Sequence, residues 1–557
     1  MSPHEYVEAL TSSHSRYLTL YSPILIPNIH PIAALRPLQM AFLRSARQED
    51  VPYAAGTNQG NEDQVRLTLM RYSIPSTITN LCGAGHIFLR VTIEALPDNV
   101  LLDIFEFYKT VRFHDLRSPW PWPWNRLVHV CQRWRYLVFA SPLRLDLCLR
   151  CTSKTPVRET LDFWPPWPIE IFVDGPYDVD NIIATFEHRD RVRWICIPNS
   201  TSSQLERLAQ MMQEPFPALT LLLLSTRETA LALPDMFLGG SAARLQSLFL
   251  TSIPFPGLPR LLSSATNLSE LFLTEIPHTG YISPEAMVIG LSALTRLRYL
   301  RIEFESPASR PDQRGLRPPP LSRIILPALE ELQFRGVSEY LEDLVARIDA
   351  PRLHYLCISF FNQVIFEIQQ LPYFIGHTGI LRSSSHAEVV IAHDHVEINL
   401  HPTDPPVNLK LEINCRAVDW QVSSMAQICN QLSFLSSTVE QLDIQVRSLE
   451  STWQVDIEDT QWLELFRPFT AVRTLRMSRA LQSLIVPALQ ELAGERATEV
   501  LPALDSLYLE YQPSESEQQA IEPFVAARQY SDRPVAVNLW KGAEVSLPPI
   551  ATWWPTE

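Results

Sequence analysis

The stretch LQSLFL, residues 245 to 250, decides the fold because its pattern L-x-x-L-x-L recurs along most of the chain. From residue 192 to 353 successive copies start 23 to 32 residues apart, and the last copies start 33 and 32 residues apart. Recurrence at this spacing is typical of a repeat architecture. The copies are VRWICI at Val192, LTLLLL at Leu219, LQSLFL at Leu245, LSELFL at Leu268, LRYLRI at Leu297, LEELQF at Leu329, LHYLCI at Leu353, VEQLDI at Val439, VRTLRM at Val472 and LDSLYL at Leu504.

Each copy predicts a short β-strand. Side chains alternate along a strand, so the fourth and sixth residues enter a shared core while the third and fifth face outward. One unit cannot bury its own apolar face, but parallel strands stacked side by side bury it continuously. The sequence therefore predicts a curved α/β solenoid. Further strands are expected within 353–439, in AEVVIAHDHVEINL and VNLKLEINC, which brings the expected total to about ten to twelve.

The outward positions of three adjacent repeats form a candidate protein-binding face. Aromatic and Arg side chains are the usual anchors of protein interfaces, and they would lie here beside a carboxylate. The alternative is that the N-terminal segment or the loop at 304–320 covers this face. The candidate substrate-binding residues are Phe249, Glu270, Phe272, Tyr299 and Arg301.

The array resembles irregular leucine-rich repeats. Regular members of that family carry Asn or Cys three residues after the sixth position, whereas this chain has Arg227, Ile253, Ile276 and Glu305 there. A regular polar ladder is therefore not expected. A leucine-rich globule without regular stacking is the alternative.

Two shorter segments ahead of the repeats have helical patterns. In LPDNVLLDIFEFY the apolar residues recur at helical spacing from Val100 to Tyr108, Pro97 suits the first helical position, and Asp98 suits the first turn. A second segment, WNRLVHVCQRWRYLVFA, has an apolar stripe of the same kind. Two short helices of this kind are stable only when they pack on each other and on a partner.

These segments, in this order, resemble the F-box, whose pattern is roughly L-P-x-E-x-L-x-x-I-F followed by V-C-x-x-W. Asn99 replaces the usual Glu, and Asp98 beside it can serve the same helix-start role. The resemblance implies that the helical unit docks on the adaptor subunit of an SCF-type cullin ubiquitin ligase, while the repeats hold the protein to be ubiquitinated. The expected adaptor-binding residues are Leu96, Pro97, Val100, Leu101, Ile104, Phe105, Val130, Cys131, Trp134 and Leu137.

An alternative to this assignment remains open. The apolar stripes could pack on the repeat array as an internal cap, since terminal repeats need capping. The chain would then be a repeat-built scaffold or binding protein without a role in a ligase. For Trp134 a structural role within the F-box packing is expected rather than a binding hot spot.

The composition argues against several other classes of protein. A formal charge of −15, from 46 Lys and Arg against 61 Asp and Glu, disfavours nucleic acid as a partner. Prolines interrupt the apolar runs of the first 31 residues, so no membrane span is expected and the chain is placed in the cytoplasm or nucleus. Eight sparse cysteines suit reduced thiols.

No motif for catalysis or a cofactor stands out. The chain lacks a Gly-rich phosphate loop, a Ser elbow and an HExxH helix, so it is not expected to be an enzyme and no cofactor is expected. Two polar patterns could suggest a metal, but Cys148-x-x-Cys151 is better explained as a strand and His393-Asp394-His395 as a hairpin turn.

The predicted organisation has four parts. Residues 1–90 are unassigned, residues 91–150 form the F-box-like helical domain, residues 151–545 form the irregular leucine-rich-repeat-like domain, and residues 546–557 form a tail. Between the two helices, Trp120, Trp122 and Trp124 alternate with proline, which is typical of a rigid aromatic loop; a polyproline ligand is the alternative.

Overall fold

The fold was analysed in a computed structural model of the 557-residue chain. The structure describes residues 96–111, 127–163, 166–173, 175–228, 231–309, 323–363, 365–366, 368–378, 384–402, 409–447, 457–492, 496 and 498–540. The unassigned segment 1–90, the tail 546–557, Cys82 and the tryptophans at 120, 122 and 124 lie outside these residues.

The described chain divides into two compact units. The helical unit comprises described residues up to Leu149 together with 160–163 and 166–167, and the repeat unit comprises Arg150–Glu159 and the described residues from Pro168 onward. The helical unit contains α4 (Asp98–Val111) and α6 (Gln132–Ala140), and α7 (Val157–Phe163) spans the division.

The predicted helix starts are partly confirmed. Helix α4 begins at Asp98, one residue after Pro97, and keeps that carboxylate in its first turn. The second helix starts later than the apolar pattern suggested, because Cys131 is extended and caps α6 by accepting a hydrogen bond from the Trp134 amide on its Sγ. Residues 127–128 are helical and residues 129–130 form a turn ahead of α6.

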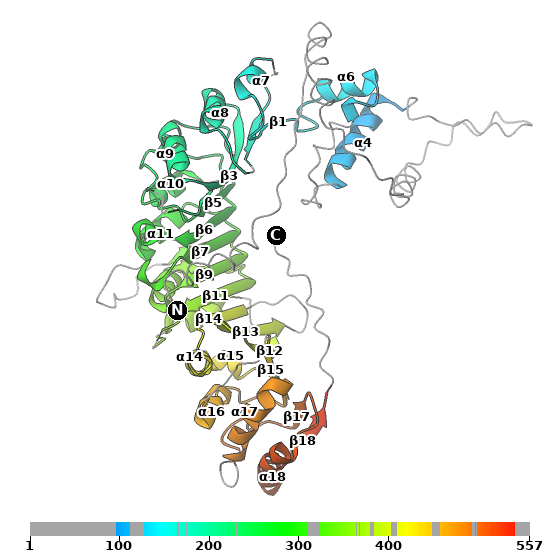
Figure 1. Ribbon diagram of the computed structural model, residues 1–557, viewed down its shortest axis with the longest axis vertical. Helices are drawn as coiled ribbons and strands as arrows, with labels where there is room; N and C mark the ends of the chain where they lie inside the picture. Colours follow the sequence, from blue (N-terminus) through cyan, green and yellow to red (C-terminus); the bar gives the residue numbers. More distant parts are fainter. Residues whose placement is uncertain are drawn as a thin grey trace, which may run out of the picture. The chain divides into compact units, whose positions relative to one another are not determined.

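The repeat unit is built on one long sheet of 16 strands in the order β1-β2-β3-β4-β5-β6-β7-β9-β11-β14-β13-β12-β15-β16-β17-β18. Figure 1 shows the strands stacked along this unit with the helices on one side. The strands are β1 Leu149–Cys151, β2 Ile169–Phe172, β3 Val192–Ser200, β4 Leu221–Thr226, β5 Ser247–Thr251, β6 Glu270–Ile276, β7 Tyr299–Phe304, β9 Glu331–Gly336, β11 Tyr355–Phe361, β12 Ser384–Ile391, β13 His395–Pro402, β14 Leu409–Asn414, β15 Gln441–Val446, β16 Thr474–Met477, β17 Ser506–Leu509 and β18 Ala536–Leu539. A separate pair joins β8 (Ile324–Ile325) and β10 (Ile348–Asp349).

The pattern that predicted the strands also explains the core. In LQSLFL the leucines at the first, fourth and sixth positions are at most 3% exposed, and the same positions are buried in the neighbouring copies. Each of β4, β7 and β9 alternates strictly between half-buried and buried residues, so one face of the sheet enters the core. The stacked solenoid is confirmed over the alternative of an irregular globule.

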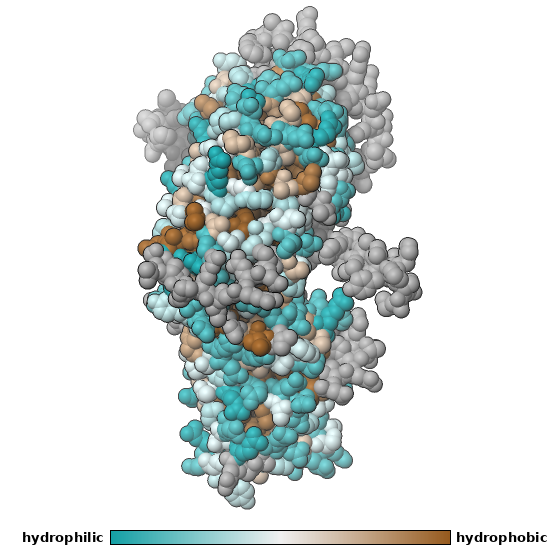
Figure 2. Space-filling view, turned by 90° about the vertical axis from the view of Figure 1, so that its left-hand side faces the viewer, coloured by the Kyte–Doolittle hydropathy of each residue, from teal (hydrophilic) through white to brown (hydrophobic). Residues whose placement is uncertain are grey.

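Helices cover the core face of the sheet. They include α9 (Ser202–Met211), α10 (Leu258–Ser264), α11 (Pro284–Leu291), α12 (Ser338–Val345), α13 (Gln370–His377), α14 (Val418–Gln431), α16 (Asp459–Phe466), α17 (Arg479–Gln490) and α18 (Glu515–Tyr530). Both α9 and α18 begin with a capping box, Thr201 with Gln204 and Ser514 with Glu517. Figure 2 shows this helical side as mainly hydrophilic, with hydrophobic groups in small scattered clusters. The opposite face of the sheet is called the open face below.

The expected count of ten to twelve strands is too low. Strands β1, β2 and β18 lack the repeat pattern, and the segment 384–414 contributes three strands. Strand β13 is antiparallel to both β12 and β14, whereas the neighbours on either side, β11 with β14 and β12 with β15, remain parallel. The hairpin therefore widens the sheet without a helix between its strands.

Cysteine positions agree with the strand prediction. Cys151 lies in β1, Cys148 directly precedes that strand, and both side chains are buried and outside any disulfide. Burial raises the pKa of Cys151 to about 12, so the thiol is neutral and poorly suited to metal binding. Among the described helices, none is both long and apolar enough to cross a membrane.

Gly336 marks a tightly packed point in this core. A Cβ added there would lie 2.6 Å from the Phe334 ring and 3.0 Å from the Phe304 ring. Both rings also pack on the buried Tyr340, with Phe334 stacked at 5.9 Å and Phe304 edge-on at 4.8 Å. We expect Gly336→Ala to lower the free energy of unfolding by about 1–3 kcal/mol, measured by chemical denaturation.

Gly376 in α13 provides the matched control for that substitution. A Cβ at Gly376 would meet nothing within 4 Å. Ala is a better helix former than Gly, so Gly376→Ala is expected to be neutral or to stabilise by up to about 1 kcal/mol. Equal effects of the two substitutions would contradict the packing argument.

Candidate functional site

The five predicted substrate-binding residues lie together on the open face. Residues at the same register position on successive strands are called a rank. One rank contains Phe249, Phe272 and Arg301, and the adjacent rank contains Glu270 and Tyr299. The same ranks continue through Leu221 and Leu223 on one side and Glu331 and Gln333 on the other. The structure thus brings all five into one surface. Leu221, Leu223, Phe249, Phe272 and Tyr299 are called the aromatic patch.

Phe249 has a different role from the one predicted. It was expected to face a substrate, but only 7% of its surface is exposed. Its ring lies 4.9 Å from the Phe272 ring, which remains half-buried. Phe249 therefore supports Phe272, because adjacent aromatic rings on neighbouring strands cover one another.

The two arginines beside the aromatic patch are both ion-paired with carboxylates. Arg301 forms an ion pair of 2.7 Å with Glu303, and Arg298 forms one of 2.6 Å with Glu330. Arg298 also lies 5.3 Å from the centre of the Tyr299 ring. Burial raises the pKa of Tyr299, Arg298 opposes the rise, and the carboxylates of Glu330, Glu331 and Glu270 add to it. The phenol is therefore neutral at physiological pH.

A second group of polar residues lies further along the open face, on β13, β14 and the end of β15. Glu397 is only 1% exposed, yet its carboxylate meets Lys410 Nζ at 2.5 Å, Arg447 at 3.1 Å and His395 Nε2 at 3.7 Å. Lys410 also lies 3.1 Å from Glu412. These five residues are called the charged cluster.

Ion pairing dominates the electrostatics of the charged cluster. Burial alone would raise the pKa of Glu397, but His395, Lys410 and Arg447 together hold it far below its usual range. The neighbouring Glu397 and Asp394 carboxylates raise the pKa of His395, and burial partly opposes that rise. Burial would lower the pKa of Lys410, but Glu412 and Glu397 raise it. Glu397 therefore stays ionised.

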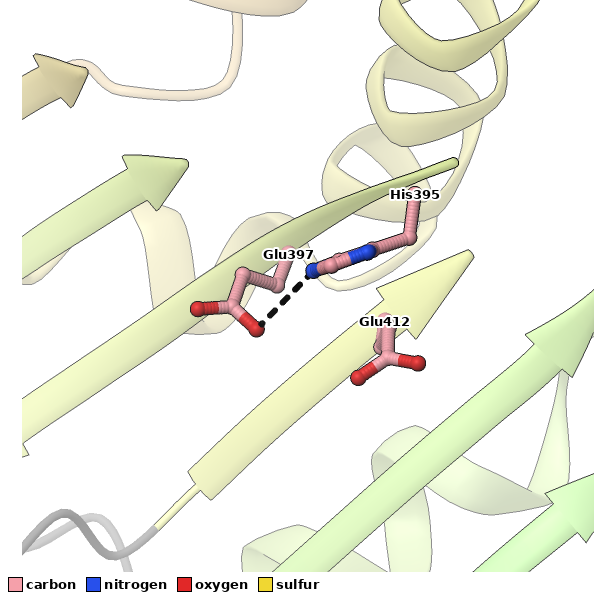
Figure 3. Close-up of side chains that lie close together, drawn as sticks. All are labelled: His395, Glu397 and Glu412. Carbon is pink, nitrogen blue, oxygen red and sulfur yellow. Dashed lines mark ion pairs between the residues drawn. The ribbon is translucent and has the colours of Figure 1, made fainter. Parts of the chain in front are cut away.

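Three members of the cluster could in principle hold a metal ion. His395, Glu397 and Glu412 each place a possible ligand atom within 4.8 Å of the others, from strands β13 and β14 (Figure 3). The Lys410 ammonium already contacts both carboxylates and supplies the positive charge that a metal would supply. A metal ion would have to displace Lys410, so the arrangement favours a structural ion-pair network.

The sequence pattern His393-Asp394-His395 forms the predicted turn. Strand β12 ends at Ile391 and β13 begins at His395, so the hairpin prediction is confirmed. The sequence reasoning missed Glu397, Lys410 and Glu412. The available signal was their charge at outward positions of the otherwise apolar runs VEINL and VNLKLEIN.

The helical unit buries part of the predicted adaptor-binding set. Phe105 packs 4.7 Å from the Trp134 ring, and Arg133 joins the two helices through Asp98 at 2.5 Å and the Leu96 carbonyl at 2.6 Å. Of the ten predicted residues, Leu101, Phe105, Trp134 and Leu137 are buried, Leu96, Val100, Ile104 and Cys131 are half-buried, and Pro97 and Val130 are exposed.

This burial corrects the adaptor-binding prediction for Leu101, Phe105 and Leu137, and it agrees with the structural role expected for Trp134. Leu101, Phe105, Trp134 and Leu137 hold the helical unit together and are not accessible as docking anchors. A second apolar stripe on α4 is more accessible: Val100, Ile104 and Phe107 follow the spacing i, i+4, i+7 of one helix face, and Phe107 is 54% exposed. These three residues are called the α4 stripe. Phe107 was not in the predicted set.

Comparisons with known proteins add little to these observations. No protein-family model matches the sequence, and no curated protein matches it. Among solved structures, a leucine-rich repeat-containing protein, LegL7 from Legionella pneumophila, aligns with 12% identity over 57% of this chain and 93% of its own, at a TM-score of 0.24. The leucine-rich-repeat-like description of this chain rests on its own strand spacing and register.

Proposed function

We propose that the chain is a non-catalytic receptor that holds a protein target on the open face of its sheet and docks, through the F-box-like helical unit, on the adaptor of an SCF-type cullin ubiquitin ligase. The proposal places the chain in the cytoplasm or nucleus. It includes no cofactor, no nucleic acid and no membrane contact, and ubiquitin transfer would belong to other subunits.

The observation that carries the proposal is the aromatic patch on an uninterrupted run of parallel strands. In β4 to β7 the outward side chains are held in register by a rigid backbone, which lowers the entropy lost on binding. Aromatic side chains beside charged ones are typical of protein interfaces. The helical side is mainly hydrophilic, which favours the sheet as the binding face (Figure 2).

The adaptor part of the proposal rests on the F-box resemblance and on the α4 stripe. Val100, Ile104 and Phe107 stay at least partly accessible after the helical unit has filled its own core. Apolar side chains of this kind each contribute about 1.5–3 kcal/mol when fully buried by a partner. A few of them are enough to dominate a docking contact.

Co-purification with the SCF adaptor tests this part. We expect wild type to recover the adaptor. The variants Val100→Asp and Ile104→Asp should each recover at least about tenfold less adaptor, since a carboxylate would be buried in an apolar contact. Ile289→Asp is the matched control, because Ile289 is an exposed apolar residue of α11 in the repeat unit. Circular dichroism would verify that all three variants fold.

A scaffold without a ligase role is the second candidate. The observation that favours it is the burial of Leu101 and Phe105, two of the motif positions, inside the helical unit itself. If wild type recovers no adaptor under conditions in which an established F-box protein does, the scaffold assignment replaces the receptor assignment.

A further inference from the structure

We propose that the aromatic patch binds a target segment in which a Lys or Arg side chain lies close to a bulky apolar side chain. This inference rests on the proposed function, because it names the chemistry of the target held on the open face. It concerns Tyr299 with its flanking residues Glu270 and Glu331, together with Leu223 and Phe272.

The strand register places a carboxylate on each side of the Tyr299 phenol. Glu270 on β6 and Glu331 on β9 both pair with Tyr299 on β7. Adjacent strands lie about 4.8 Å apart, so the two Glu positions lie about 10 Å apart with the ring between them. A neutral aromatic ring between two carboxylates attracts a cation through both the ring quadrupole and the negative charges.

The cations already present do not neutralise these two carboxylates. Within the described residues, the Glu270 carboxylate makes no hydrogen bond and no ion pair, and the Glu331 carboxylate accepts a hydrogen bond of 2.6 Å from the neutral Gln333 amide. The nearby Arg298 and Arg301 are each ion-paired with another carboxylate. The rank Glu270–Tyr299–Glu331 therefore keeps an excess of negative charge on the open face.

Apolar side chains adjoin this negative rank. Phe272 and Leu223 are half-buried and lie in the next rank, and the Phe249 ring lies between their strands, 4.9 Å from the Phe272 ring. From Leu223 on β4 to Tyr299 on β7 is three strand spacings, about 14 Å. An extended peptide rises about 3.3 Å per residue, so its apolar and basic side chains would be separated by about four residues.

The charge balance also separates this ligand class from others. A phosphate backbone or an anionic lipid surface would meet two carboxylates that have no cation of their own, which is unfavourable. A purely apolar segment would leave both carboxylates desolvated without a partner, which costs free energy. A basic side chain would pair with the two carboxylates, and a neighbouring apolar side chain would pack on Leu223 and Phe272.

The test is a selection of random displayed peptides on the full-length chain, with peptides long enough to span about 14 Å. We expect the enriched sequences to carry Lys or Arg near a bulky apolar residue. The best peptide would then be labelled and its Kd measured by fluorescence anisotropy. We expect Glu270→Gln, Glu331→Gln to weaken it about tenfold and Tyr299→Ala to weaken it further.

Glu206→Gln is the matched control, because it removes the same charge from an exposed position of α9 on the helical side. It should leave the Kd unchanged. The inference is overturned by a selection without enriched peptides, by an acidic consensus, or by an unchanged Kd in the double Gln variant. None of these substitutions touches the α4 stripe, so adaptor recovery would still report separately on the proposed function.

Discussion

Lys410→Met should lower the free energy of unfolding of the repeat unit by about 2–4 kcal/mol at neutral pH. Glu397 is 1% exposed and would lose its closest counterion, which now lies 2.5 Å away. Met fills a similar volume, so the loss would come from the charge. Arg447 stays 3.1 Å from Glu397, which keeps the expected cost below that of an isolated buried carboxylate. Calorimetric or denaturant unfolding measures the loss.

The pH dependence of that loss identifies its cause. The pKa of Glu397 is lowered in the folded chain, so its contribution is present above the unfolded value of about 4.3 and is lost as the pH falls through the lowered folded value. Removing Lys410 moves the folded pKa of Glu397 upward. The stability of the variant should therefore approach that of wild type as the pH falls below 7 through the raised pKa of Glu397 in the variant, where its carboxylate takes up a proton.

Two further variants separate the ion pair from packing. Glu397→Gln combined with Lys410→Met removes both charges, so it should recover part of the stability lost by Lys410→Met alone. Lys410→Arg keeps the charge and should cost much less than Lys410→Met. A Lys410→Met deficit that does not shrink as the pH is lowered through the acid range in which both proteins stay folded would show that lost packing, rather than the unpaired Glu397, is responsible.

The repeat pattern made most strands of the sheet predictable from the sequence. The remaining strands and their pairing were not predictable, because short local sequences do not specify them. Burial of every second residue in L-x-x-L-x-L is a property of each strand alone, so the strands and their open face followed from the sequence. The turn predicted the hairpin of β12 and β13, but the insertion of β13 between β12 and β14 was not predicted, because β-rich runs such as AEVVIAHDHVEINL carry no information on which further strand they pair with. Strand β18 lies at the sheet edge with exposed apolar residues, and its short sequence AVNL resembles many loops.

The candidate site was predictable in position and less so in detail. The repeat spacing placed all five candidate residues on one face, but the register sets Tyr299 beside Glu270 and sets Arg301 beside Phe272. The burial of Phe249 and the ion pair of Arg301 with Glu303 depend on neighbouring side chains. On α4 the apolar residues 100, 101, 104 and 105 form two adjacent stripes of one helix. Sequence periodicity alone could not decide which stripe packs on α6, since both contain large aliphatic or aromatic residues.

Phe105→Ala should unfold the helical unit and leave the repeat unit folded. Phe105 is 1% exposed and packs on Trp134, and replacing a buried Phe by Ala costs about 3–5 kcal/mol. Helices of 14 and 9 residues are not stable alone in water, so α4 and α6 depend on this contact. The expected cost is comparable with the whole stability of a small domain. Hydrogen exchange should show lost protection in α4 and α6 and unchanged protection in β4 to β7.

Phe107→Ala is the control on the same helix, because Phe107 is 54% exposed and its truncation should cost less than about 1 kcal/mol. The pair distinguishes two ways of losing the adaptor. Phe105→Ala would abolish docking by removing the fold that presents the α4 stripe, whereas Val100→Asp or Ile104→Asp would abolish it with α4 still protected. Unchanged protection of α4 in Phe105→Ala would mean that this ring does not hold the unit together, and Phe105 would then return to the set of residues available for a partner.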